Sequence, residues 1–231
     1  MSAANAAGRN AVITRLATPP AYAPEVESNW DQPPWRGVPE LVLDRHMGTK
    51  PAHFPRTSAK LGWDAEALYV IFRVEDHFVR AVARKHQDSV CTDSCVEFFF
   101  CPGMDISRGY FNLELNCGGT ALFHFQVVPR QNQIPLAAEH MARLSINRSL
   151  PQIVEPEIQE PVTWFVECRV PFGVLGPYRE IARPKPGDTW RGNLYKCADN
   201  TSHPHWLTWS PIERPRPDFH VPDQFGMLTF G

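Results

Sequence analysis

Prolines and short strand-forming runs limit the fold of this chain more than any other feature of its sequence. The 231 residues include 23 prolines, and each proline lacks a backbone N–H group and ends or kinks a helix. Between them stand short runs of β-branched and aromatic residues, spaced by about ten residues and separated by turn-forming residues. This pattern predicts an all-β sandwich of antiparallel strands rather than alternating strands and helices.

Two neighbouring strands are predicted between residues 88 and 119. In the first, one face carries Val96, Phe98 and Phe100, and the other carries Asp93, Cys95, Glu97 and Phe99. In the second, Phe111, Leu113 and Leu115 alternate with Asn112, Glu114 and Asn116. A loop with a proline and two glycines separates the runs, as is typical of antiparallel neighbours. We therefore expect a half-buried sheet whose outer face carries carboxylates and amides.

The same reasoning gives the rest of the chain. Further strands are predicted at 41–43, 59–64, 67–76, 121–128, 162–171, 189–197, 206–209 and 219–230, and one short helix at 134–143. Residues 1–29 read as a tail and an irregular lead-in, and residues 30–231 as one sandwich domain, with Trp30–Pro39 as an extended segment across it. A chain of this length can bury roughly 70% of its unfolded surface, so its folding requires no metal or disulfide.

The charge and hydrophobicity of the chain limit the kinds of binding partner that we expect. The formal net charge is -2, which gives no reason to expect nucleic acid or an anionic membrane, and no apolar run is long enough for a membrane span. The first residues lack a basic start and an apolar core, so we expect a cytoplasmic protein, or a secreted one whose leader is missing from this sequence.

The six cysteines and the acidic loop residues are the candidates for disulfides or metal sites. In a chain of this length an even number of cysteines indicates disulfides only weakly, and we expect buried free thiols. Cys197, Asp199, His203 and His205 match no common zinc spacing, so no metal site is predicted there. The loop-edge residues that could offer oxygen ligands to calcium are Asp64, Asp76, Asp88 and Asp93.

A polar patch is the first candidate site. If the strands are neighbours, their outward residues form one surface: Arg73, Glu75, Glu97, Asn112, Glu114, Asn116, Glu167, Arg169 and Asn193. Such a mixture of donors and acceptors suits sugar hydroxyls. The alternative is an ordinary solvated sheet face with weak cross-strand ion pairs.

Two aromatic residues in turn-rich stretches are the second candidate. Trp206 follows His203 and His205, and Phe219 stands between Asp218 and His220. A flat aromatic face beside polar groups can pack against the C–H patches of a sugar ring. The alternative is that both rings plug the end of the sandwich.

Catalysis would need more than these residues. Glu97 with Glu114 or Glu167 could supply the two carboxyl groups of a glycosidase, but carboxylates on any two adjacent strands would meet the same distance. The common nucleophile, zinc-hydrolase, phosphate-loop and dinucleotide motifs are all missing from the sequence. We therefore assign no catalytic residue.

The order of several motifs resembles carbohydrate-binding module family 9. The motifs are Trp63-Asp64, Leu68-Tyr69-Val70, Val74-Glu75-Asp76, Asp93-Ser94, Val96-Glu97-Phe98-Phe99, Tyr110, Leu115-Asn116 and Phe225-Gly226-Met227-Leu228. The resemblance runs from about Trp30 to the end of the chain. It implies a jelly-roll type β-sandwich that binds sugars without catalysis, usually attached to secreted plant-polysaccharide hydrolases.

Residue by residue, the resemblance carries over in part. It places the family's glutamate on Glu97 and its late tryptophan on Phe219, whereas Val90 or Cys91 stands where the early tryptophan would be. Glu114 stands near a position where an arginine is expected. The resemblance also implies structural calcium, although the acidic N-terminal run that helps to bind it is missing here.

The predicted carbohydrate-binding residues are Glu97, Glu114, Tyr195, Lys196, Trp206 and Phe219. The predicted ligand is a mono-, oligo- or polysaccharide, and the predicted role is in carbohydrate catabolism. Two alternatives stay open: a glycan-active enzyme or accessory subunit of an O-glycosyl hydrolase, and a binding module for a non-sugar ligand such as haem.

Overall fold

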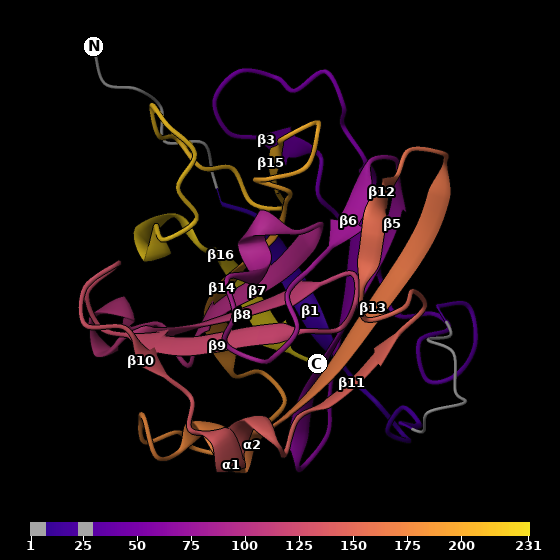
Figure 1. Cartoon of the computed structure of the whole chain (residues 1–231). Coiled ribbons are helices and arrows are strands. Elements are labelled where there is room, and N and C mark those ends of the chain that lie inside the picture. The colour runs from indigo at the N-terminus through magenta and orange to yellow at the C-terminus, as the bar shows by residue number, and fades with distance from the viewer. Residues whose placement is uncertain (1–7, 23–29) are drawn as a thin grey trace.

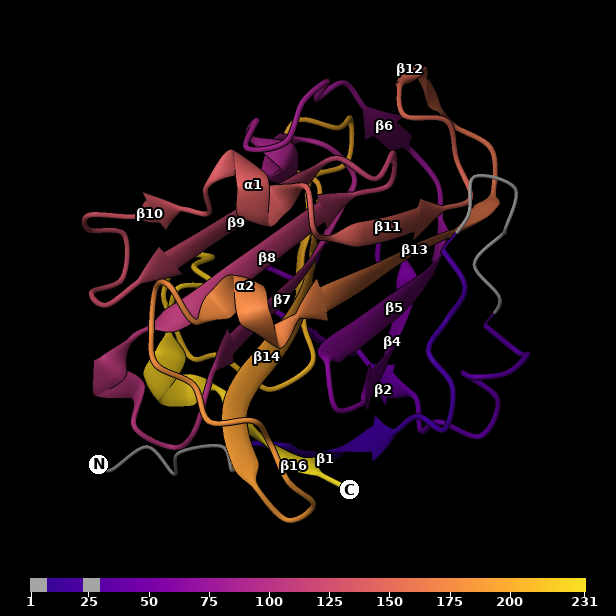
Figure 2. The same ribbon diagram turned by 90° about the horizontal axis from the view of Figure 1, so that it is seen from below.

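Two layers of β-strands, joined at one edge by a shared strand, face each other across a common core (Figures 1 and 2). The computed structural model describes residues 8–22 and 30–231. The front sheet has the order β10 (Ile134–Pro135), β9 (Ala121–Gln126), β8 (Tyr110–Asn116), β7 (Cys95–Cys101), β14 (Thr189–Cys197) and β16 (Gly226–Phe230). The back sheet has the order β4 (Arg56–Trp63), β5 (Ala67–Asp76), β13 (Val162–Pro171) and β11 (Ser145–Arg148).

Shorter elements complete the sandwich. β2 (Leu41–Val42) pairs with β4, and β15 (Trp206–Thr208) lies between β14 and β3 (Arg45–His46). β6 (Val79–Ala81) and β12 (Val154–Ile158) form a separate two-stranded sheet. The helical pieces of the described residues are α1 (Ala138–Met141), α2 (Phe172–Leu175) and three 3₁₀ turns, η1 (Val90–Thr92), η2 (Ile106–Arg108) and η3 (Pro222–Gln224). The predicted all-β sandwich is confirmed.

β1 (Asn10–Arg15) joins the two sheets and was not predicted. Its first residues pair in parallel with β16, and Thr14 and Arg15 pair in parallel with β4. In Figure 2 this strand runs from β16 toward β4 along the bottom of the molecule. The predicted lead-in therefore contains a strand, and the pairing is antiparallel except at β1.

The predicted helix over residues 134–143 is largely wrong. Ile134 and Pro135 are extended and pair with β9, and only Ala138–Met141 are helical. Proline disfavours the helical conformation of the residue before it, which explains the extended start. No helix in the described part of the chain is long and apolar enough to cross a membrane.

The inner faces of the two sheets form the main core. The front sheet contributes residues such as Val96, Phe98 and Leu113, and the back sheet contributes Val70, Phe72 and Trp164. These are the apolar positions of the alternating runs, so the two-residue period correctly assigned their faces.

Both outer faces are covered as well, which differs from the expected half-buried sheet. On the front sheet, residues 211–225 form a covering segment that packs Phe219 and Phe225 against Phe99 and Tyr195. On the back sheet, Trp30 and Trp35 pack on Tyr69 and Ile71, as expected for a segment crossing the domain. Loops therefore exclude water from faces that the sequence pattern marks as polar.

The single polar patch predicted from the sequence is divided between the two sheets. Glu97, Asn112, Glu114, Asn116 and Asn193 belong to the front sheet, whereas Arg73, Glu75, Glu167 and Arg169 belong to the back sheet. Each group faces outward on its own side of the sandwich. Glu167 therefore cannot act together with Glu97.

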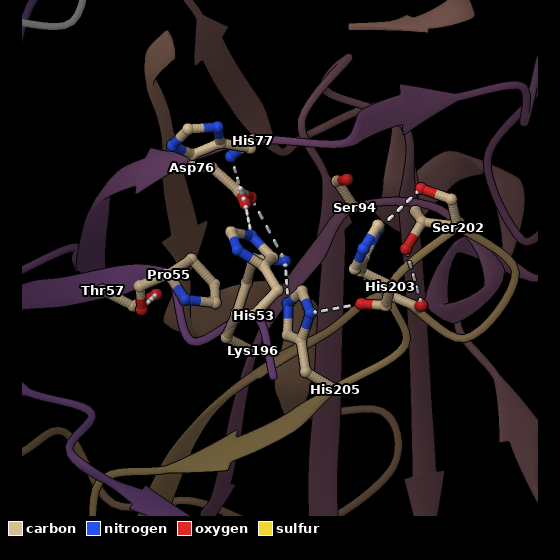
Figure 3. Close-up of polar contacts among 12 residues, drawn as sticks. His53, Pro55, Thr57, Asp76, His77, Ser94, Lys196, Ser202, His203 and His205 are labelled. Carbon is tan, nitrogen blue, oxygen red and sulfur yellow. Dashed lines mark hydrogen bonds and ion pairs between the residues drawn. The ribbon is translucent and has the colours of Figure 1, made fainter. Parts of the chain in front are cut away.

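A buried ionic network joins the sheets at the end of β5 (Figure 3). Lys196 of β14 is fully buried, with its Nζ 3.5 Å from Oδ2 of Asp76 and 2.7 Å from Nε2 of His205. His53 Nε2 lies 2.6 Å from the other oxygen of Asp76, and Trp164 Nε1 also donates to this carboxylate. Burial alone would raise the pKa of Asp76, but the Lys196 ammonium and the His53 hydrogen bond hold it well below its usual value.

We expect Lys196→Met to lower the free energy of unfolding by about 3–5 kcal/mol, because it leaves the Asp76 carboxylate buried without its cation. The Lys196→Met/Asp76→Asn double variant should lose less than the sum of the two single variants. Urea denaturation at pH 7 measures all three. Strict additivity would show that the two charges do not interact.

A buried carboxyl group on the back sheet gives a second test. Glu167 exposes 2% of its surface and accepts hydrogen bonds from Trp35 Nε1 at 2.9 Å and the Tyr22 hydroxyl at 3.2 Å. Burial raises its pKa to about 7 despite these donors. The folded state therefore binds this proton more tightly than the unfolded state, so stability falls as the pH rises from about 4.5 to about 7.

Glu167→Gln should increase the free energy of unfolding at pH 8 by about 1–3 kcal/mol, because the amide keeps the acceptor oxygen and removes the buried charge. The gain should disappear at pH 4, where the wild-type carboxyl group is neutral in the folded protein. Urea denaturation at the two pH values tests this. An equal effect at both would contradict it.

Candidate functional site

A pocket of about 160 Å³ opens above the outer face of the front sheet. Its walls come from β7, β8, β14, β15, η1 and three loops. The lining residues are Cys91, Glu97, Glu114, Arg130, Cys197, Asp199, Trp206, Pro217, Asp218, Phe219 and His220. Two wider hollows lie elsewhere, but their aspartates are already paired, Asp76 with Lys196 and Asp44 with Arg9.

Two carboxyl groups form the floor of the pocket. Glu97 of β7 and Glu114 of β8 are directly opposite each other in the strand register. The Cys197 thiol donates to Oε1 of Glu97 at 3.2 Å, and the Asn112 amide donates to Oε1 of Glu114 at 2.9 Å. Because the two side chains share one face of adjacent strands, the alternation of the sheet brings them together.

Burial governs the charge of this floor. It raises the pKa of Glu114 to about 7, and burial together with the neighbouring Glu114 raises the pKa of Glu97 well above its usual value. At neutral pH the pair therefore retains at least part of its protons. A protonated carboxyl group donates one hydrogen bond and still accepts others, which lets the floor serve both kinds of ligand group.

Trp206 and Asp199 form one wall. Trp206 begins β15 and pairs with Cys197 of β14, so the short hairpin holds its half-buried indole beside the floor. Its Nε1 donates to Oδ1 of Asp199 at 2.9 Å, and the backbone N–H of Asp199 donates to the carbonyl of Cys91. These contacts fix the orientation of the ring.

Phe219 belongs to the covering segment of residues 211–225 and lines another part of the pocket. Its ring stacks on Tyr195 with centroids 4.1 Å apart and an interplanar angle of 11°, and the Tyr195 hydroxyl donates to its carbonyl at 3.1 Å. Phe219 exposes only 7% of its surface, so it offers the pocket an edge rather than an open face.

Arg130 brings the cationic group of the pocket lining. Its Nε and Nη2 donate to Oδ1 of Asp218 at 3.1 and 2.8 Å. His220 also lines the pocket, and its Nδ1 lies 2.7 Å from the Tyr110 hydroxyl. Burial, with Arg130 nearby, lowers the pKa of His220 to about 4, so this ring is neutral at pH 7.

Four of the six residues predicted from the sequence line this pocket. They are Glu97, Glu114, Trp206 and Phe219. Tyr195 lies beneath Phe219 and supports it without lining the pocket. Lys196 does not belong to the site: it points to the inner face of β14, into the network with Asp76, because successive residues of a strand face opposite sides.

Sequence reasoning missed three charged groups of the lining as parts of the site: Arg130, Asp199 and Asp218. Each is brought to the pocket by a loop. Arg130 has a positive φ of 60°, a conformation uncommon for residues other than glycine that is found preferentially at functional sites. Cys91 lines the pocket where the resemblance placed an early tryptophan, and Trp206 supplies an aromatic ring from a different strand.

The aspartates considered for calcium do not fit such a site. Asp64 and Asp88 accept backbone N–H groups of their own turns. Asp93 accepts the backbone N–H groups of Val82 and Ala83, and Asp76 is held by Lys196 and His53. His205, considered for zinc, is bound to Lys196. Among residues 8–22 and 30–231, potential metal-ligating atoms gather in one group, Cys95, Glu97 and Cys197.

All six cysteines are free, five of them buried and Cys91 half-buried. The predicted buried thiols are therefore present. Burial raises the pKa of the Cys91 thiol well above its usual value and that of Cys95 to about 12, so both thiols are protonated at neutral pH.

The chain is similar to known carbohydrate-binding proteins in sequence and in structure. A family model described as carbohydrate-binding family 9 matches residues 41–230, and no curated protein matches the sequence. A candidate carbohydrate-binding protein from Bacteroides uniformis has 26% identity and a TM-score of 0.84, with 97% of this chain and 100% of that chain covered.

Two further structures are of one carbohydrate-binding module family 9 from Caldicellulosiruptor kristjanssonii. The complex with glucose has 14% identity and a TM-score of 0.61, covering 96% of both chains. The complex with cellotriose has 14% identity and a TM-score of 0.60, covering 96% of this chain and 93% of that chain. At this identity the likeness shows the fold.

Proposed function

The chain belongs to carbohydrate-binding family 9, and from this premise we propose that it binds a saccharide, without transforming it, in the pocket above Glu97 and Glu114. The observation that carries the proposal is the convergence in one pocket of two carboxyl groups, an arginine and the rings of Trp206 and Phe219. Sugars need this combination, because their hydroxyls both donate and accept while their C–H faces pack on aromatic rings.

The size of the pocket favours one sugar residue at a time. Its volume of about 160 Å³ is well below the roughly 300–1,000 Å³ typical of sites that enclose drug-sized ligands. A single ring therefore occupies the pocket, and the rest of any longer chain extends into solvent. Glucose and cellotriose, the ligands of the two Caldicellulosiruptor complexes, are the first compounds to test.

The arrangement of the carboxyl groups favours binding over hydrolysis. A glycosidase places its two carboxyl groups on either side of the bond to be cleaved. Glu97 and Glu114 are side by side on the floor, at directly opposed positions of adjacent strands, so a sugar lies above both. We propose that the protein serves carbohydrate catabolism as a binding component, with hydrolysis by partner enzymes.

Trp206→Ala should weaken the binding of glucose or cellotriose by about tenfold or more, because it removes the half-buried ring of the pocket wall. Isothermal titration calorimetry measures the affinity, and circular dichroism verifies the fold. Met104→Ala is the matched control, since it removes a side chain that is 49% exposed and outside the pocket. Unchanged affinity in the Trp206 variant would remove this ring from the site.

Glu114→Ala should weaken sugar binding by about 10–100-fold, because a hydrogen bond to a charged or polarised carboxyl group contributes about 1.5–3 kcal/mol. Glu75→Ala on the outer face of the back sheet is the control and should bind as the wild type does. The same titrations extend to a panel of mono- and oligosaccharides. If the folded wild-type protein binds none of them, the proposed function is wrong.

A further inference from the structure

Two thiols and a carboxyl group meet beneath the pocket. Cys95 and Glu97 are two residues apart in β7 and so share its outer face, and Cys197 of β14 is the register partner of Cys95. The sulfur atoms and one carboxylate oxygen of this trio lie within 4.8 Å of one another. The arrangement follows directly from strand alternation and register, and saccharide binding does not require the thiols.

We propose that Cys95, Glu97 and Cys197 form a binding site for a thiophilic divalent cation, with Zn²⁺ as its natural occupant. Cysteine thiolates select zinc over calcium or magnesium, which prefer oxygen ligands. Cys197 Sγ lies 3.2 Å from Glu97 Oε1, which is close to the roughly 3.5 Å expected between two ligands of a tetrahedral zinc ion with bonds of about 2.0–2.3 Å.

The surroundings suit a bound cation. Cys95, Glu97 and Cys197 expose 0%, 2% and 1% of their surfaces, so their orientations are fixed by packing rather than by solvent. Glu97 and Cys197 also line the pocket, which provides an entry path for the cation. Without a cation the thiols keep their protons, and binding Zn²⁺ releases them.

Three of the other four cysteines lie apart from this trio. Cys101 lies on the same strand and the same face as Cys95, but its thiol is held by the carbonyl of Asp105 and by Arg179. Cys117 and Cys168 lie in the main core. Cys101→Ser is therefore a matched control: it removes a buried thiol of β7 and leaves the trio intact.

The test uses the full-length chain, free of an affinity tag, after reduction and removal of metal. Titration with Co²⁺ is followed by the thiolate-to-cobalt charge-transfer absorption, and bound Zn²⁺ is counted by native mass spectrometry after dialysis. We expect one cation for each chain in the wild type and in Cys101→Ser. Cys95→Ser and Cys197→Ser should bind at least about tenfold more weakly, and the cobalt that they still bind should give a weaker charge-transfer band, because each variant keeps one thiolate. Glu97→Gln should keep the band and weaken binding.

Several results would overturn the proposal. They are a wild-type protein without a charge-transfer band, cation binding that survives in the Cys95 and Cys197 variants, and a Cys95–Cys197 disulfide whose reduction yields no cation binding. If the serine variants do not fold, the wild-type spectrum and Glu97→Gln still decide, because the band reports thiolate ligands directly. Sugar titrations of the metal-free wild-type protein test saccharide binding by itself, so failure of the proposed function can be told apart from failure of the cation site.

Discussion

Burial of both faces of β7 is the constraint on which the chemistry of this protein depends. Its inner face, with Val96 and Phe98, lies in the main core, and its outer face lies under the covering segment of residues 211–225. Glu97 is therefore a carboxyl group almost without water, and its pKa rises for that reason. If the front sheet were open to solvent, Glu97 and Glu114 would be ordinary ionised glutamates. The pocket exists because loops close over this face of the sheet.

Sequence alternation correctly assigned the faces of the long strands, and with them the core. The apolar positions of 67–76, 95–101 and 162–171 have the faces that their two-residue period assigns, and the family suggested by the motifs is confirmed. The period does not tell which sheet a strand joins or what covers its outer face. For this reason the nine-residue polar patch was predicted as one surface and is in fact two, and β1 was overlooked in a stretch that reads as a lead-in.

Four residues of the candidate pocket were predictable from the sequence. Glu97 and Glu114 follow from alternation, and Trp206 and Phe219 from the turn residues beside them. Lys196 was predicted to face the ligand because a lysine is not expected at a position that faces the core. The structure shows that it faces inward and pairs with Asp76. Arg130 reaches the pocket through a loop with positive φ, for which the sequence offers no glycine as a signal.

The front sheet keeps the Lys196 ammonium on its inner face and the Glu97 and Glu114 carboxyl groups on its outer face. Lys196 is committed to Asp76 on the inner face, so this buried cation does not neutralise Glu97 and Glu114 on the outer face of the neighbouring strands. The cationic residue of the described pocket lining, Arg130, is paired with Asp218. Among the described residues, neither carboxyl group of the floor therefore has an ion pair with a protein cation. A ligand that reaches them, whether a sugar above the floor or a cation at Cys95, Glu97 and Cys197, meets buried carboxyl groups that no basic side chain holds.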